Sequence, residues 1–159
     1  MKYISFFAAL LFVFSGLLLS GCGPARPSDL PPIAPCKVKV HDNGRPLANI
    51  SVFFQRTEDH GGAWSLNGLT GSNGVAIAKT IVGAYEAKGL PIGTYRVYMG
   101  ERVEIPPELY NFERMNPEAE KYVTENRVLP VILTGMQSPI EVNVTKSGAE
   151  LDVDISKFK

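Results

Sequence analysis

The sequence predicts an all-β fold, a β-sandwich of about seven strands with one short helix in an insertion, and three observations support it. Apolar and polar residues alternate with a period of two in several short segments, as they do in half-buried strands. Gly, Asn, Asp and Pro cluster between these segments, about every 8–12 residues. The one stretch with helical character lies in a charged insertion over residues 100–128. A chain of 159 residues fits one domain of ordinary size.

The first half of the folded part supplies four predicted strands. Cys36, Val38 and Val40 alternate with polar residues and open the first of them. Turn-forming residues then separate each strand from the next. The predicted strands cover 36–41, 50–55, 64–66 and 75–82, with connections at 42–47, 56–63 and 68–74.

The second half begins with a tight turn at 89–93 and a strand at 94–99, which places Tyr95, Val97 and Met99 on one face. Residues 101–105 are predicted to add an edge strand that ends at the following two prolines. An N-cap Asn, a Pro at the first helical position and acidic residues behind it predict a helix over 117–125. Two alternating segments at 140–145 and 151–155, joined by a turn at 146–148, predict a C-terminal hairpin.

The N-terminus has the three-part layout of a secretory signal peptide. Lys2 supplies the positive charge, and the apolar stretch over 4–19 is shorter than a comfortable transmembrane span. Leu19, Ser20, Gly21 and Cys22 then resemble the bacterial lipobox, in which a diacylglycerol is attached to the Cys thiol. The resemblance implies a lipoprotein signal peptide over 1–21, cleavage between Gly21 and Cys22, and lipid attachment at Cys22. An ordinary signal peptide with a coincidental Cys and an uncleaved anchor are the alternatives.

Residues 22–35 are predicted to be the lipidated Cys and a tether. Five prolines in the thirteen residues 23–35 stiffen the chain towards polyproline II. At about 3.1 Å per residue such a tether holds a domain up to roughly 40 Å from the bilayer. Gly23 stands where an Asp would favour inner-membrane retention, so the lipoprotein sorting rule favours the outer membrane. If Cys22 carries lipid, Cys36 is the one remaining thiol, and we expect it to be buried as a small apolar residue.

Three stretches of the folded part carry a family resemblance in sequence order. They are Asn43-Gly44-Arg45-Pro46-Leu47, then Gly68-x-Thr70-Gly71-Ser72-Asn73-Gly74, then Leu90-Pro91-x-Gly93-x-Tyr95. Together they resemble the turns of carboxypeptidase-regulatory-like domains. Leu129-Pro130 and Ser138-Pro139 are similar to the closing segment of small bacterial lipoproteins that carry this domain. The resemblance implies a transthyretin-like, immunoglobulin-like β-sandwich over 36–159.

Residues that carry chemistry are few. His41 and His60 lie about twenty residues apart without a partner at ligand spacing, so we expect no metal site and no cofactor, and His60 beside Glu58 and Asp59 is interpreted as a polar loop. No nucleophile elbow or phosphate-binding Gly-rich loop is present in the sequence. Four glutamates of the insertion are interpreted as a solvated face instead of a catalytic pair. They are Glu113, Glu118, Glu120 and Glu125.

Three function hypotheses remain. Equal numbers of basic and acidic side chains, 16 of each, exclude a generically basic nucleic-acid binder. The first hypothesis is a non-enzymatic, lipid-anchored envelope protein that displays the sandwich as an interaction or structural module for an envelope protein or a glycan. The second is a glycan-binding module that uses Trp64, Tyr95 and Tyr98, although Trp64 is favoured as a residue packed at the core or its rim. The third is a hydrolase that uses the glutamates of the insertion.

Overall fold

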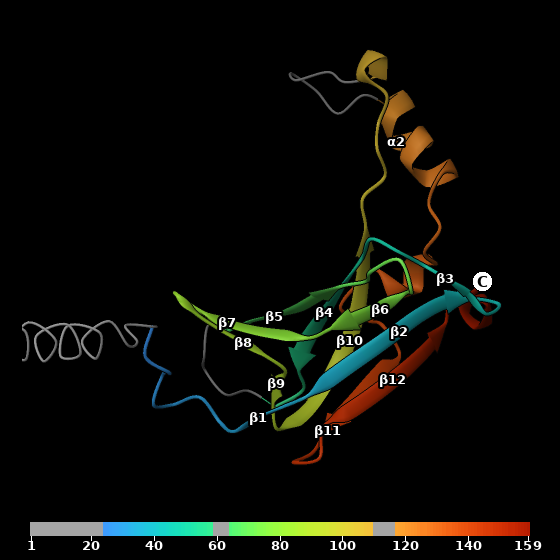
Figure 1. Ribbon diagram of the computed structural model, residues 1–159. Helices are drawn as coiled ribbons and strands as arrows, with labels where there is room; N and C mark the ends of the chain where they lie inside the picture. The colour runs from blue at the N-terminus through green and yellow to red at the C-terminus, as the bar shows by residue number, and fades with distance from the viewer. Residues whose placement is uncertain (1–23, 59–63, 110–116) are drawn as a thin grey trace, which may run out of the picture.

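The computed structural model describes residues 24–58, 64–109 and 117–159 (Figure 1). The predicted signal peptide, with Gly21 and Cys22, lies outside the described residues. Within them the chain is mostly β, with antiparallel sheets and one short α-helix, α2 (Pro117–Glu125). No helix of the described ranges is both long and apolar enough to cross a membrane.

The larger sheet has six antiparallel strands in the order β11-β10-β4-β5-β7-β8. Its longest strand is β10, next to the edge strand, and it pairs with β4 on one side and β11 on the other. The strand bounds are β4 (Ile50–Arg56), β5 (Ser65–Leu69), β7 (Lys79–Val82), β8 (Tyr85–Lys88), β10 (Gly93–Glu101) and β11 (Ile140–Val144).

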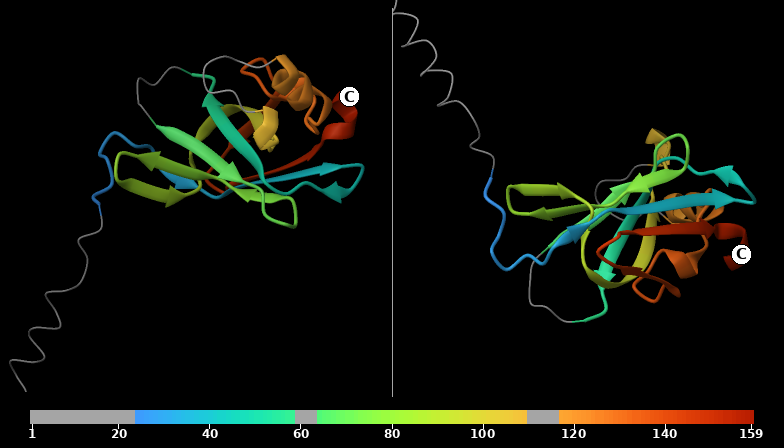
Figure 2. Two further views of the ribbon diagram at one scale, coloured as in Figure 1. Left: turned by 90° about the horizontal axis from the view of Figure 1, so that it is seen from above. Right: turned by 60° about the horizontal axis from the view of Figure 1, so that its bottom comes forward.

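The smaller sheet is built around one central strand, β2 (Cys36–Asp42). β12 (Ala149–Asp154) pairs with β2 in parallel, whereas β3 (Arg45–Pro46) and β6 (Val75–Ile77) pair with it in antiparallel. Figure 2 shows this sheet from two further sides.

One bent segment contributes a strand to each of the two sheets. The single strand predicted over 75–82 is divided at Ala78, since β6 belongs to the smaller sheet and β7 to the larger one. At the bend, the Ala78 N–H donates to the Cys36 carbonyl at 3.0 Å. A bridge from Thr70 to Ala76 also joins the end of β5 to β6. The outer surfaces of the two sheets therefore meet along β6.

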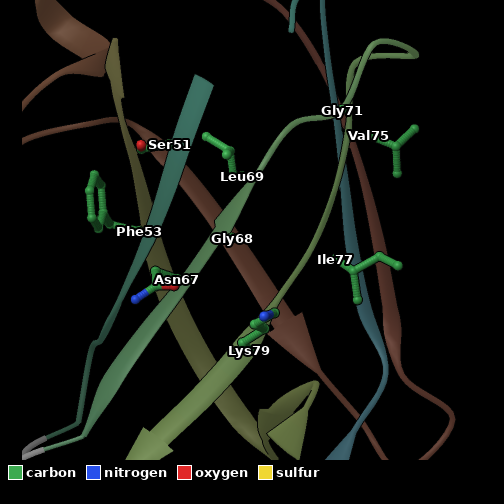
Figure 3. Close-up of a pocket in the computed structure, with 9 residues that line it drawn as sticks. All are labelled: Ser51, Phe53, Asn67, Gly68, Leu69, Gly71, Val75, Ile77 and Lys79. Atoms are coloured by element: carbon green, nitrogen blue, oxygen red, sulfur yellow. The ribbon is translucent and has the colours of Figure 1, made fainter. Parts of the chain in front are cut away.

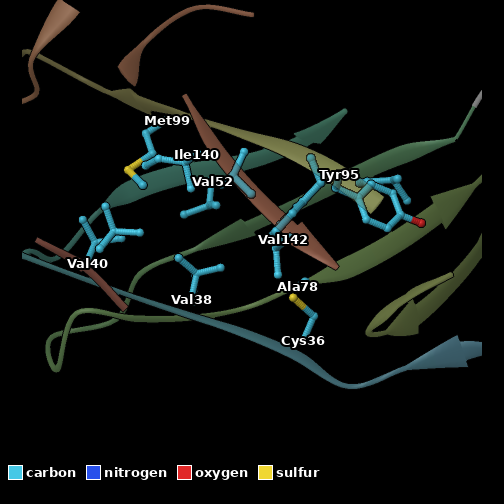
Figure 4. Close-up of a cluster of buried hydrophobic side chains, with 14 of the residues drawn as sticks. Cys36, Val38, Val40, Val52, Ala78, Tyr95, Met99, Ile140 and Val142 are labelled. Atoms are coloured by element: carbon cyan, nitrogen blue, oxygen red, sulfur yellow. The ribbon is translucent and has the colours of Figure 1, made fainter. Parts of the chain in front are cut away.

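One hydrophobic core lies between the sheets. The inward positions of β10 are Tyr95, Val97 and Met99, and all three are buried, as the alternation predicted. Cys36 and Val38 of β2 point towards the larger sheet (Figure 4). The burial predicted for Cys36 is confirmed, with 1% of the residue exposed.

Two expectations about strand pairing are wrong. The C-terminal hairpin does not form, because β11 joins β10 in the larger sheet and β12 joins β2 in the smaller one. The residues between them turn tightly, but they carry the chain from one sheet to the other. No edge strand covers 101–105 either, since β10 runs continuously to Glu101 and the chain then leaves the sheet.

Packed structure begins ahead of the predicted first strand. Leu30 and Ala34 are buried, at 4% and 3% exposed. β1 (Ile33–Ala34) pairs with β9 (Leu90–Pro91), which lies in the segment predicted as a tight turn. The Pro-rich segment is therefore folded against the domain over part of its length.

Residues 102–109 and 117–127, which we call the arm, project from the sheets (Figure 1). Their helix α2 has the predicted bounds, and none of its residues is buried. The base of the arm is closed by Glu101, whose two carboxylate oxygens accept the N–H groups of Val128 and Leu129, each at 2.9 Å.

Candidate binding surface

Trp64 lies at the rim of the core. It is half-buried and packs against the core cluster. The guanidinium carbon of Arg56 lies 5.8 Å from the centroid of the indole ring, a cation–π contact. Arg56 also donates to the Ile92 carbonyl at 3.2 Å, so its guanidinium is held in place beside the ring. A ligand that stacked on the same face of the indole would have to displace Arg56.

The other two aromatic residues of the glycan hypothesis lie on opposite faces of β10. Tyr95 is fully buried, and its hydroxyl donates to the Pro91 carbonyl at 2.6 Å, so it is a core residue and not a surface contact. Tyr98 is half-buried on the outer face, where its ring stacks on Phe53 with centroids 5.2 Å apart and planes 18° apart. The period of two along the strand explains the difference.

Groups able to do acid–base or nucleophilic chemistry are engaged in structural contacts. Burial raises the pKa of the Cys36 thiol to about 11, so the reactive thiolate is scarce at neutral pH. His41 Nε2 lies 2.6 Å from a carboxylate oxygen of Asp152, and its Nδ1 accepts the Gly44 N–H at 3.0 Å. Both ring nitrogens therefore have partners.

The acidic residues do not converge on a metal site in the described ranges. No group of three or more His, Cys, Asp or Glu side chains is placed there to hold an ion. Glu118, Glu120 and Glu125 all lie on α2, and Glu125 pairs with Lys121 at 3.8 Å. His60, Asp59 and Glu113 lie outside the described residues.

The outer face of the larger sheet carries a shallow hollow that no sequence motif pointed to. We call it the sheet-face groove, and its volume is about 500 Å³. Figure 3 shows that its lining comes from the adjacent strands β4, β5, β6 and β7 and the turn after β5. The lining residues are Ser51, Phe53, Asn67, Gly68, Leu69, Gly71, Val75, Ile77 and Lys79.

Strand alternation explains which side chains face this groove. Ile50, Val52 and Phe54 point into the core, so Ser51 and Phe53 between them point outwards. On the neighbouring strand Leu66 is buried, whereas Leu69 is 60% exposed. A signal for the groove was present in the sequence: the consecutive Phe53 and Phe54 break the alternation and place one large apolar side chain on the polar face.

The groove is apolar with isolated polar groups at fixed positions. Phe53 is paired with Asn67 across β4 and β5, and Asn67 with Lys79 across β5 and β7. The Asn67 amide donates to Ser65 at 3.0 Å, and the Lys79 ammonium pairs with Glu86 at 2.7 Å. Such a surface can bind a ligand that offers both apolar and hydrogen-bonding groups. None of the side chains that line it is an activated nucleophile.

No family model, no curated protein and no solved structure matches this chain. The family resemblance of its turn motifs therefore stays a prediction. What the described residues show is a mostly β protein with antiparallel sheets.

Proposed function

We propose that this chain is a lipid-anchored protein of the bacterial cell envelope, held at the outer membrane, that displays one non-catalytic, transthyretin-like β-sandwich as a binding module. One observation carries the proposal: an apolar segment ends in Leu19, Ser20, Gly21 and Cys22 and is followed by a Pro-rich stretch and a single folded unit. A Cys at that place is suited to acylation, and the multiple chains of a mature lipoprotein give a stable anchor.

The fold of the Pro-rich stretch supports a short connection to the bilayer. The Arg26 guanidinium donates to the carbonyls of Leu30 and Pro31, each at 2.8 Å, and the Leu30 N–H donates to Pro27. The chain is therefore turned back from Arg26 on, so in the proposed anchor only the few residues between Cys22 and Arg26 separate the lipid from the folded part. At about 3.1 Å per residue they span roughly 12 Å, so the proposed anchor holds the domain close to the membrane.

The turn geometry supports a transthyretin-like sandwich. The turn glycines of the motifs quoted above include Gly74, with φ of 73°, and Gly93, with φ of 152°, both in the region that L-residues avoid. A Cβ atom at Gly74 would lie 2.6 Å from the Val40 carbonyl oxygen, so this turn packs directly on β2. Two sheets with a shared core, joined by such turns, are what this type of sandwich requires.

A binding role without catalysis is supported by the way reactive groups are used. The Cys36 thiol is buried, the Tyr95 hydroxyl is bonded to a backbone carbonyl, and both nitrogens of His41 are paired. The sheet-face groove, in turn, offers contact area instead of an activated group.

Metabolic labelling with a radiolabelled fatty acid tests the anchor. The full chain should take up the label and partition with the membrane fraction, whereas Cys22→Ala should do neither. Cys36→Ala is the matched control, because it removes the other cysteine and should keep the label. Equal labelling of the wild type and Cys22→Ala would overturn the proposal.

Glycan binding is the second candidate, and the position of Tyr98 favours it. The ring of Tyr98 stacks on Phe53 at the border of the sheet-face groove, on a face that the rest of the described chain leaves open. Aromatic side chains on an open sheet face can stack on the apolar face of a sugar ring.

A further inference from the structure

We propose that the sheet-face groove is a binding site for a neutral oligosaccharide, recognised by side chains alone. Phe53, Leu69 and Ile77 form its apolar platform, and Ser51, Asn67 and Lys79 supply hydrogen bonds. This inference rests on the proposed role as a binding module, and it names the ligand class and the place. It does not depend on the lipid anchor.

The groove exposes more apolar surface than a solvated sheet face requires. Leu69 is 60% exposed and Ile77 is 50% exposed, and both line the same hollow as Phe53. Single exposed apolar residues are ordinary, but a contiguous group rimmed by polar residues marks an interaction site. The ligand must therefore present an apolar face.

The strand register sets polar groups beside these apolar ones. Ser51 is paired with Leu69 across β4 and β5, and Phe53 is paired with Asn67 in the next row. Neither the Ser51 hydroxyl nor the Asn67 carbonyl oxygen has a hydrogen-bond partner within the described part of the chain. A sugar ring has an apolar face of C–H groups and a rim of hydroxyls, so it can use both kinds of group at once.

The backbone of the groove argues against an extended peptide. β4 is paired on both sides, with β5 and β10, and β5 is likewise paired with β4 and β7. Their N–H and C=O groups are therefore used within the sheet, and strand addition needs a free edge. A ligand on this face is recognised through side chains, which suits a sugar better than a peptide main chain.

The charges around the groove indicate that the sugar is neutral. Lys79 is paired with Glu86 at 2.7 Å. Two further lysines border the adjoining surface of β2, and both are paired: Lys37 with Glu150 at 3.1 Å and Lys39 with Asp152 at 3.3 Å. Because every one of these cations has its own carboxylate, the surface offers no excess positive charge to a polyanion.

The size of the surface fits a chain of sugars. The groove volume of about 500 Å³ lies within the range of roughly 300–1,000 Å³ that is usual for small-ligand sites. Val75 lines both this groove and a second hollow of about 230 Å³ beside β2 and β12, so the two hollows adjoin at this residue. An oligosaccharide can extend from one into the other along β6.

The experiment measures binding of the detergent-solubilised full chain to an array of short neutral hexose oligosaccharides, followed by calorimetry with the best binder. Leu69→Asp and Asn67→Ala should each weaken binding about tenfold or more, which corresponds to about 1.4 kcal/mol. Val131→Asp is the matched control, because Val131 is 71% exposed but lies outside the groove, and it should bind like the wild type. Thermal melts of all three variants establish that they are folded.

The outcomes separate this inference from the anchor. Binding that is lost in the groove variants, kept in Val131→Asp and unchanged by added salt supports a neutral-sugar site. Absence of binding to every neutral oligosaccharide, equal loss in Val131→Asp, or binding only to acidic glycans or peptides would overturn it. Fatty-acid labelling of Cys22 would be unaffected by any of these results, so failure of the sugar site and failure of the anchor are distinguishable.

Discussion

Tyr95 shows at the scale of one residue how the core and a turn are fixed together. Its ring meets Phe54 edge-to-face, with centroids 6.5 Å apart and planes at 88°. Its hydroxyl crosses from the core to the Pro91 carbonyl of β9, the strand that pairs with β1. One side chain therefore links strand β10 of the larger sheet to the place where the N-terminal segment docks.

Tyr95→Phe should lower the free energy of unfolding by about 1–3 kcal/mol, because it removes a buried hydrogen bond. Burial, opposed in part by Arg56, raises the pKa of Tyr95 to about 12. In the unfolded chain the Tyr95 hydroxyl ionises near pH 10, so the wild type should lose stability as the pH rises from 10 to about 12. Tyr95→Phe has no hydroxyl to ionise and should not show this loss. Urea unfolding at several pH values measures both effects.

Tyr98→Phe is the control for this prediction. Its ring lies on the outer face, and its hydroxyl has no hydrogen bond in the described part of the chain. Its stability should stay close to that of the wild type. Equal losses in the two variants would contradict the role assigned to Tyr95.

At the scale of elements, the pairing of β12 with β2 is marked by complementary charge. Lys37, Lys39 and His41 lie on the outer face of β2, in parallel register with Glu150, Asp152 and Asp154 on β12. Each exposed ion pair contributes only about 0–1 kcal/mol. The larger effect is on which strand pairs with β12. The acidic side chains of β12 face basic ones on β2, whereas they would face the acidic Glu141 if β12 paired with β11.

Asp154→Ala should lower stability at neutral pH and lose this effect in acid. The Asp154 carboxylate accepts the Ser156 hydroxyl at 2.8 Å and the Asn43 N–H at 3.0 Å. These hydrogen bonds hold the pKa of Asp154 below its ordinary value. The stabilisation is therefore present above the pKa of the unfolded chain and is lost as the pH falls through the lower pKa of the folded state.

Acid titration of the urea midpoint for the wild type and Asp154→Ala checks this pH dependence. Glu150→Ala on the same strand is the control, since Glu150 makes a single exposed ion pair with Lys37. A difference between wild type and Asp154→Ala that persisted unchanged in strong acid would contradict the argument.

Local pattern accounts for the elements that the sequence predicted correctly. The alternation around Val38, Phe54 and Val97 reported which face of each strand is buried, and Pro117 with its acidic neighbours marked the start of α2. Alternation within one strand does not indicate which other strand pairs with it. The pairing of β11 and β12 with different sheets depends on non-local packing, as does the short strand β8, so neither could be predicted.

The candidate site was harder to predict for the same reason. Trp64 was a candidate ligand contact because it is the one tryptophan of the sequence, yet its ring is in contact with Arg56. The groove depends on Leu69 of β5 and Ile77 of β6 lining the same hollow beside the bend at Ala78, and no turn residue marks that bend. Only the extra Phe53 was a local signal.

At the scale of the whole molecule, the described N-terminal segment and the arm lie at opposite ends of the sheets. Figure 1 shows β1 at one end of the sheets and α2 at the other. On the proposed anchor, the arm therefore points away from the bilayer. Because α2 buries none of its residues, the arm is an appendage that the core does not need for its own packing.

Replacing residues 103–126 with a short Gly-Ser linker should leave the fold intact. Closing a loop costs free energy that rises only slowly with its length, so the shorter loop should stabilise the chain by about 1 kcal/mol at most.

Glu101→Ala should instead destabilise the chain, because the N–H groups of Val128 and Leu129 lose the carboxylate that closes the base of the arm. Thermal melts and circular dichroism compare the two variants, and the oligosaccharide array adds a second readout. Since no residue of the groove belongs to the arm, sugar binding should survive the replacement. A linker variant that failed to fold would show that the arm belongs to the core of the domain after all.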